Sequence, residues 1–308
     1  MKGFWRGHAF CATMLDLDPD VLATVLELLN LADLSRLRGV SRALFEAASE
    51  EDRRRSTMGL PRVVALVEQP SCLALTVDSL VVVGVSSPFV RHMVRIFSDH
   101  LETTQPEGVR AVAVSDSRLF VLDEHHVMMA ALPQHGLPIW YDAISPQVLD
   151  FEEATSLALV GERLLVMDTA EERVVALGAA NLQLQMTIGS LLLPMGAAAV
   201  DNELYITEMG ADRVAVVSLA GVRQRTLQLD AAYGLVAPQG IAAIAACFDH
   251  EALLVVACER CALVMSTRGI VMQRLLLGRH RLGCVVCDDS HVYVTEYERG
   301  RVWRLVVW

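Results

Sequence analysis

The sequence predicts a mainly β fold: a closed β-propeller of about six blades, preceded by a small segment of three short helices. Three observations lead to this prediction. A strand pattern returns roughly every forty residues over most of the chain. Residues 15–48 follow a helical apolar period instead. Apolar residues make up 53% of the 308-residue chain, which is enough for a large buried core.

Residues 15–48 have the periodicity of three short helices. Asp18-Pro19-Asp20 is typical of a helix start, because proline suits the first turn and acidic groups favour the positive end of the helix dipole. Asn30 suits the end of this helix, and Gly39 ends the second one. Helices this short bury little of their own surface. We therefore expect a partner, or the propeller, to cover their apolar face.

This helical segment resembles the F-box. The motif consists of a proline, a helix rich in Leu and Ile, Asp-Leu and then Val-Ser-Arg, which here fall at Pro19, residues 21–29, Asp33-Leu34 and Val40-Ser41-Arg42. The resemblance implies a Skp-family adaptor and its cullin complex as partners, bound mainly through buried apolar area. The implied adaptor-binding residues are Pro19, Leu22, Val25, Leu26, Leu29, Leu34 and Val40. The alternative is an amphipathic helical cap packed on the propeller.

The chain divides into a tail at residues 1–14, the helical motif and linker at 15–57, and the propeller at 60–308. Residues 61–308 hold eighteen basic and twenty-eight acidic side chains, and this acidic excess argues against nucleic acid as a partner. No apolar run approaches the length of a membrane span, and the start lacks a signal-peptide core. The seven cysteines are an odd number, which favours a reducing compartment, the cytoplasm or the nucleus.

The repeats are clearest in three passages, at residues 164–175, 204–215 and 292–303. In each, an acidic residue ends one apolar strand and an arginine begins the next strand five positions later; the pairs are Asp168–Arg173, Glu208–Arg213 and Glu296–Arg301. Weaker copies start at residues 80, 119 and 253. Pro-x-Gly precedes several units. Its proline fixes a turn, and its glycine permits close backbone approach. Four short strands per unit are typical of a propeller blade.

This region resembles the NHL repeat, which reads Pro-x-Gly, Leu-Tyr-Val-x-Asp and Arg-Val. Residues 193–221 hold the best copy, and the resemblance covers roughly residues 71–308. It implies an NHL-like propeller. The last repeat stops after its third strand, whereas residues 62–67 form an extra apolar strand ahead of the first repeat. We therefore expect residues 62–67 to complete the last blade and leave no open sheet edge.

The acid–arginine pairs are interpreted as structural hairpin pairs, because a catalytic group is needed once and these recur in successive units. Two Cys-x-x-Cys pairs, at 258–261 and 284–287, have the spacing of a four-cysteine zinc site. The second pair lies within an apolar strand, where residues three apart point to opposite faces. We expect buried structural cysteines, no metal, no cofactor and no catalytic residue.

The insertion at residues 133–151 holds Trp140 and Tyr141, which are candidates for binding a target protein if they lie on an exposed loop. Alternatively, Trp140 fills a gap between blades. The leading hypothesis is a non-catalytic substrate receptor of a cullin-type (SCF) ubiquitin ligase, with the adaptor on the helices and an unidentified target on the propeller. The alternatives are a propeller hydrolase or lactonase with a metal on the axis, and a plain NHL scaffold.

The adaptor hypothesis predicts the outcome of a pull-down with purified Skp-family adaptor. We expect the wild type to bind, and a variant with Leu26→Asp and Leu34→Asp not to bind, because buried carboxylates oppose apolar association. A circular dichroism spectrum of the variant should show that the propeller still folds. A folded wild type that fails to bind would exclude this hypothesis.

Overall fold

The computed structural model describes residues 62–306 except 67–69, 76–78, 88–89, 98–100, 105–108, 116, 124–125, 132–138, 145–150, 152, 230–236, 247–250, 276, 278–280 and 289–290. The tail at 1–14 and the helical motif at 15–57, with every predicted adaptor-binding residue, lie outside the described residues. Within the described residues, the helical structure is a single 3-10 turn, η1 (Met209–Ala211), and no helix is long and apolar enough to cross a membrane.

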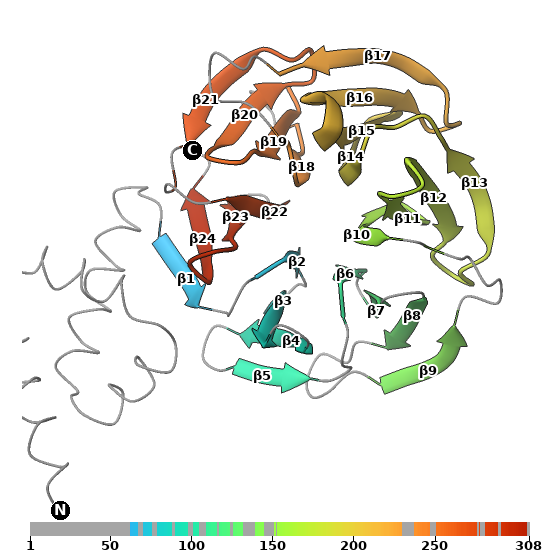
Figure 1. Cartoon of the computed structure of the whole chain (residues 1–308), viewed down its shortest axis with the longest axis vertical. Coiled ribbons are helices and arrows are strands. Elements are labelled where there is room, and N and C mark those ends of the chain that lie inside the picture. Colours follow the sequence, from blue (N-terminus) through green and yellow to red (C-terminus); the bar gives the residue numbers. More distant parts are fainter. Residues whose placement is uncertain are drawn as a thin grey trace, which may run out of the picture.

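The described strands form six four-stranded antiparallel sheets, arranged as blades around a common axis (Figure 1). The first blade holds β2 (Cys72–Leu75), β3 (Ser79–Ser87), β4 (Val90–Phe97) and β5 (Leu101–Thr104). The second holds β6 (Ala111–Val114), β7 (Arg118–Leu122), β8 (Val127–Ala131) and β9 (Ile139–Ile144). The third holds β10 (Ala154–Val160), β11 (Arg163–Asp168), β12 (Arg173–Gly178) and β13 (Leu184–Ile188).

The fourth blade holds β14 (Pro194–Val200), β15 (Glu203–Glu208), β16 (Arg213–Ser218) and β17 (Arg223–Gln228). The fifth holds β18 (Ile241–Ile244), β19 (Leu253–Ala257), β20 (Ala262–Ser266) and β21 (Val271–Leu275). The sixth holds β22 (Leu282–Cys287), β23 (His291–Glu296) and β24 (Arg301–Val306), with β1 (Arg62–Leu66) at its outer edge. The predicted mainly β propeller is confirmed, and the repeated passages are the second and third strands of the blades.

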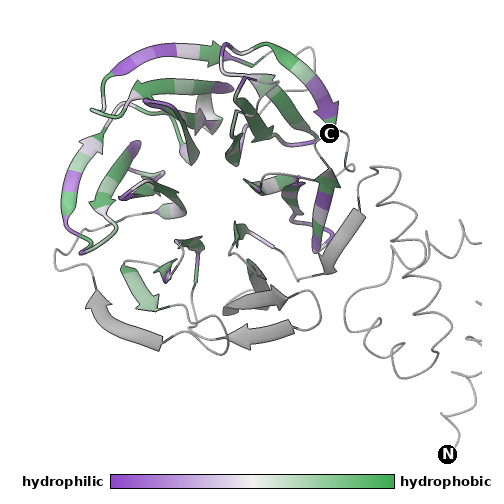
Figure 2. Ribbon diagram, turned by 180° about the vertical axis from the view of Figure 1, so that it is seen from behind, coloured by the Kyte–Doolittle hydropathy of each residue, from purple (hydrophilic) through white to green (hydrophobic). Residues whose placement is uncertain are grey.

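The core lies between the blades, where the apolar faces of neighbouring sheets pack together. In the third, fourth and fifth blades the second and third strands are buried along nearly their whole length. One apolar cluster joins the fourth and fifth blades and another joins the fifth and sixth. The fourth strands β13, β17 and β21 are mostly exposed. They are also more polar than the middle strands, as Figure 2 shows. A middle strand therefore needs a blade on each side to cover both of its faces.

The glycines of the Pro-x-Gly motif allow the inner strands to approach closely near the axis. The N–H of Gly240 donates a hydrogen bond to the carbonyl of Gly283 in the next blade at 3.0 Å. A Cβ atom on Gly240 would lie 2.7 Å from the amide nitrogen of Val285, which is too close for any side chain. Gly196 packs in the same way against Gln239. The motif thus brings neighbouring blades together where the ring is narrowest.

The ring closes between the two ends of the described chain, in the sixth blade (Figure 1). Strand β1 pairs antiparallel with β24, with Arg62 opposite Arg304 and Leu66 opposite Arg301. The register shifts between Val63 and Ala65. The strand expected at residues 62–67 thus occupies the outer edge of the sixth sheet and satisfies the backbone groups of β24.

This closure predicts that residues 60–68 are needed for the whole ring. Deleting them should expose the edge of β24 and abolish the cooperative thermal transition, because the sixth blade then loses its outer strand. Thermal melting followed by circular dichroism measures this effect. Deletion of residues 1–59, which retains β1, is the matched control. An unchanged melting curve for the 60–68 deletion would rule out this closure as a stability requirement.

Candidate functional site

The most regular polar feature lies at the turns between the second and third strands of the blades. Asp168, Glu208 and Glu296 are the last residues of β11, β15 and β23, and all three are buried. A buried carboxylate is costly unless charged or hydrogen-bonding groups satisfy its oxygens. The partners of each carboxylate therefore decide whether it is held for structure or left available for chemistry.

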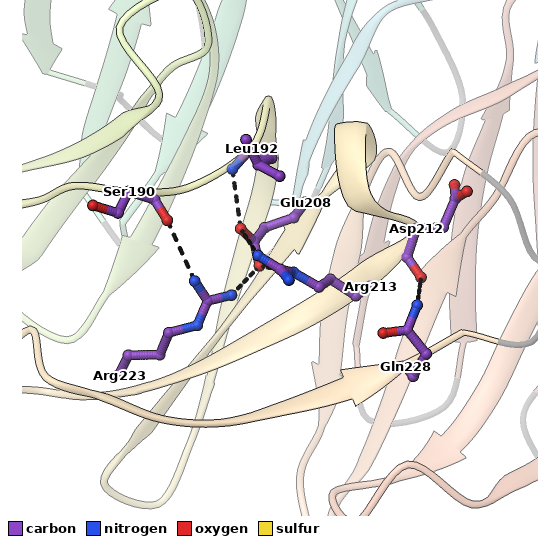
Figure 3. Close-up of polar contacts among 7 residues, drawn as sticks. All are labelled: Ser190, Leu192, Glu208, Asp212, Arg213, Arg223 and Gln228. Atoms are coloured by element: carbon purple, nitrogen blue, oxygen red, sulfur yellow. Dashed lines mark hydrogen bonds and ion pairs between the residues drawn. The ribbon is translucent and has the colours of Figure 1, made fainter.

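Glu208 has the fullest set of partners (Figure 3). Its carboxylate accepts hydrogen bonds from Arg213 Nε at 2.6 Å and Arg213 Nη2 at 3.0 Å, and it also contacts Arg223 Nη2. The backbone N–H of Leu192, in the segment that enters the same blade, donates to Oε1 at 3.0 Å. Arg223 also donates to the carbonyl of Ser190 at 3.3 Å. The carboxylate thus joins three strands and the entering segment of one blade.

The electrostatics of Glu208 follow from these contacts. Burial raises the pKa of its carboxyl, but hydrogen bonds from Arg213 and Leu192 and the charges of Arg223 and Arg213 outweigh that effect. The net result is a pKa below the ordinary value. The same contact raises the pKa of the Arg213 guanidinium. Glu208 is therefore a structural anion and not a proton donor near neutral pH.

The other two acids have fewer partners of the same kind. Asp168 receives Arg173 Nε at 2.9 Å and the backbone N–H of Glu153 at 3.5 Å. Glu296 accepts a hydrogen bond from Trp303 Nε1 at 2.9 Å, whereas Arg301 Nη1 lies 4.0 Å away. The three acid–arginine pairs named from the sequence therefore lie in three separate hairpins. They do not converge on one site.

Threonines beside these acids connect neighbouring blades. Thr169 Oγ1 donates to the carbonyl of Pro194 at 2.9 Å, which joins the third blade to the fourth. Thr207 Oγ1 donates to the carbonyl of Gln239 at 2.7 Å, which joins the fourth to the fifth. Both of these hydrogen bonds are buried. The threonine hydroxyl groups at these turns therefore hold neighbouring blades together.

The inner strands have a different character. β2, β6, β10, β14, β18 and β22 contain no Asp, Glu, Lys, Arg or His. Their half-buried residues are mainly small or apolar, such as Ala158, Ala199, Ala243 and Val286. The strands surround the axis, as Figure 1 shows. A molecule that approached the axis would meet an uncharged surface in this part of the ring.

Two pairs of cysteines lie in contact. Cys258 and Cys261 flank one hairpin turn, where the Cys258 N–H donates to the Cys261 carbonyl at 2.8 Å, and both side chains are buried. A hydrogen bond from Cys258, with support from Arg274, lowers the pKa of Cys261 to about 6. The second pair, Cys72 and Cys284, lies on the inner strands β2 and β22. The sequence spacing of the cysteines did not indicate this second pair.

The described residues do not fit a metal site. Within them, no three His, Cys, Asp or Glu side chains lie close enough together to hold an ion. Cys284 contacts Cys72 and Leu73, and is not grouped with Cys258 and Cys261 as a four-cysteine site would require. A metal on the axis, one of the alternatives from the sequence, has no candidate ligand set in this part of the chain.

The insertion with Trp140 and Tyr141 differs from its predicted form. These residues lie in β9, the outer strand of the second blade, with Trp140 opposite Ala130. A long exposed loop was one of the two alternatives for these residues, but residues 139–144 instead form the fourth strand of the blade. Their role in binding a target stays a prediction, as does the role of the adaptor-binding residues outside the described part.

No family model and no curated protein matches the sequence. Among solved structures, the chain is similar to a gluconolactonase of Xanthomonas campestris, with a TM-score of 0.60, 12% identity and coverage of 80% of this chain and 94% of that one. A virginiamycin B lyase of Staphylococcus aureus has a TM-score of 0.54 and 8% identity, with coverage of 80% of this chain and 99% of that one. The WD40 domain of Toxoplasma gondii coronin has a TM-score of 0.54 and 12% identity, with coverage of 77% of this chain and 69% of that one. At such low identity these similarities show the propeller fold alone.

These similarities correct the expectation that the chain is a non-catalytic subunit. Solved propellers that match nearly the whole ring include a gluconolactonase and streptogramin B lyases, so the fold of this chain is shared with enzymes. The inference from a propeller to a passive receptor therefore fails. The comparisons give no support to an F-box, to NHL membership or to a ubiquitin-ligase role.

The Glu208 network predicts a pH-dependent stability difference between the wild type and Glu208→Gln. We expect the variant to lose about 2 kcal/mol at neutral pH, because two arginines lose their buried counter-charge while remaining partly exposed. The pKa of Glu208 is lower in the folded chain than in the unfolded chain, where it is near 4.5. The stabilisation is therefore complete above that pH and is lost as the pH falls through the lower, folded-state pKa.

Urea unfolding at pH 7 and at acidic pH measures this difference. Glu203→Gln is the matched control, because Glu203 pairs with Arg225 where both side chains are more exposed, at 25% and 40%. We expect the control to cost less than about 1 kcal/mol. Two outcomes would contradict this role of the Glu208 network. One is an equal loss of unfolding free energy in Glu208→Gln and Glu203→Gln, and the other is a loss in Glu208→Gln that does not shrink in acid.

Proposed function

We propose that this propeller is an enzyme of the hydrolase or lactonase kind, which accepts an uncharged, largely apolar small molecule at its axis. The observation that carries the proposal is the composition of the six inner strands, which hold no charged side chain and no histidine. A charged substrate would lose its hydration there without gaining a partner, whereas a neutral apolar one would gain buried area.

The similarity of the ring to a gluconolactonase and to streptogramin B lyases supports an enzymatic role over a purely structural one. The charged turn residues support it indirectly. Asp168 and Glu208 accept hydrogen bonds from Arg173 and Arg213, so we assign these carboxylates a structural role. We therefore propose that the substrate binds at the axis and not at these turns. The proposal contains no metal, because the described residues offer no ligand set for one.

The test measures binding and turnover with neutral lactones of increasing alkyl chain length. Binding is followed by displacement of the uncharged dye Nile red, and turnover by acid release in a pH-stat. We expect affinity to increase with chain length, and we expect the corresponding anionic hydroxy acids to bind at least about tenfold more weakly.

A pair of variants at Ala243 separates charge from shape, provided that circular dichroism shows both to fold, because this half-buried residue of β18 also packs against the core between the fourth and fifth blades. Ala243→Asp should weaken lactone binding by more than about tenfold, whereas Ala243→Asn, which has nearly the same shape, should have a smaller effect. Met272→Asp on the exposed face of β21 should leave binding unchanged. A folded wild type that neither binds nor hydrolyses neutral lactones, or that prefers the anions, would contradict the proposal.

A further inference from the structure

The seam between the first and sixth blades holds two cysteines on facing inner strands. Cys72 is the first residue of β2 and Cys284 is the third residue of β22. They are more than two hundred residues apart in the sequence, yet β2 and β22 are neighbours in the ring (Figure 1). The strand before β2 in the chain, β1, pairs with β24 at the outer edge of the sixth blade.

The contacts fix both sulfur atoms. The thiols of Cys72 and Cys284 are in hydrogen-bond contact, and Cys284 Sγ lies 3.8 Å from the carbonyl oxygen of Leu73. The backbone N–H of Val112, in the second blade, donates to Cys72 Sγ at 3.5 Å. Cys72 is 3% exposed, whereas Cys284 is half-buried. Both sulfur atoms therefore lie 3.8 Å from the same carbonyl oxygen, that of Leu73, on strands that are neighbours in the ring.

The pKa values of the two thiols are shifted in opposite directions. The hydrogen bond that Cys284 donates lowers the pKa of Cys72, and although burial opposes the effect, the net shift is downward. The same hydrogen bond, together with burial, raises the pKa of Cys284. Cys72 is thus the thiol that ionises first, and Cys284 is the thiol that keeps its proton.

We propose that Cys72 and Cys284 form a redox-active dithiol that closes to a disulfide across the seam, with hydrogen peroxide as the oxidant. The Cys72 thiolate attacks one peroxide oxygen and the O–O bond breaks, which leaves a sulfenic acid on Cys72 and, after protonation, one water. The Cys284 sulfur then attacks the Cys72 sulfur. The S–O bond breaks and a second water leaves with the Cys284 proton, so two thiols and one peroxide give one disulfide and two waters.

Hydrogen peroxide suits this site because it is small and uncharged. Cys72 is nearly inaccessible, so a bulky disulfide oxidant would not reach it, and the inner strands present no charge to an ionic one. The bond would enclose the chain from the first blade to the last, and a cross-link across a long loop restricts the unfolded chain strongly. The oxidised ring should therefore resist opening at its seam.

Cys258 and Cys261 provide an internal comparison. They are also in contact, but they flank a single turn, so a bond between them would close a loop of only a few residues and would join no separate blades. Oxidation at this turn and oxidation at the seam therefore predict different cross-linked peptides and different effects on stability.

The experiment treats the reduced full-length chain with hydrogen peroxide, alkylates the remaining thiols and maps the cross-linked peptides by mass spectrometry. We expect a peptide that links Cys72 to Cys284, and a faster-migrating band on a denaturing gel that reducing agent abolishes. The melting temperature of the oxidised protein should rise by about 5–10 °C. Cys261→Ala should behave like the wild type.

Cys284→Ala should lose the cross-link, the fast band and the rise in melting temperature. The wild-type peptide map decides the proposal by itself if this variant does not fold. Alkylation of both Cys72 and Cys284 after peroxide treatment would overturn it. So would a cross-link found only at Cys258–Cys261, or a rise in melting temperature that persists in Cys284→Ala.

Discussion

The burial of each blade on both faces by its neighbours is the constraint on which the rest of this structure depends. Strands such as β11 and β19 are apolar almost throughout, and both faces of each strand are buried. A blade at the end of an open row would expose one of these faces, as well as unpaired backbone groups. The ring must therefore close, and β1 completes the sheet where the last blade would otherwise end.

This constraint also explains where the charges lie. Carboxylates and arginines are concentrated at the turns, where Glu208 joins β15, β16 and β17 to the segment that enters the blade. Threonines then join that blade to the next one. Because these polar groups hold the ring together, the inner strands can remain uncharged. The axis is consequently the part of the fold with the most freedom to recognise a small molecule.

The seam between the first and sixth blades combines two means of closure at different depths. At the outer edge the backbone of β1 pairs with β24, and in the inner layer Cys72 meets Cys284. The backbone hydrogen bonds between β1 and β24 form in any redox state, whereas a pair of thiols can be oxidised. The proposed enzyme site at the axis would therefore lie beside the thiol pair for which we propose oxidation by peroxide.

The sequence by itself determined the repeating strands, the acid–arginine hairpins and the extra strand at residues 62–67, because each is a local pattern of apolar period, turn residues and spacing. Only the tertiary structure decided that Arg223 and the N–H of Leu192 also contact Glu208, that Trp140 lies in an outer strand, and that Cys72 meets Cys284. These contacts depend on how each blade is turned about the axis and on which faces meet. No local pattern in the chain records that geometry.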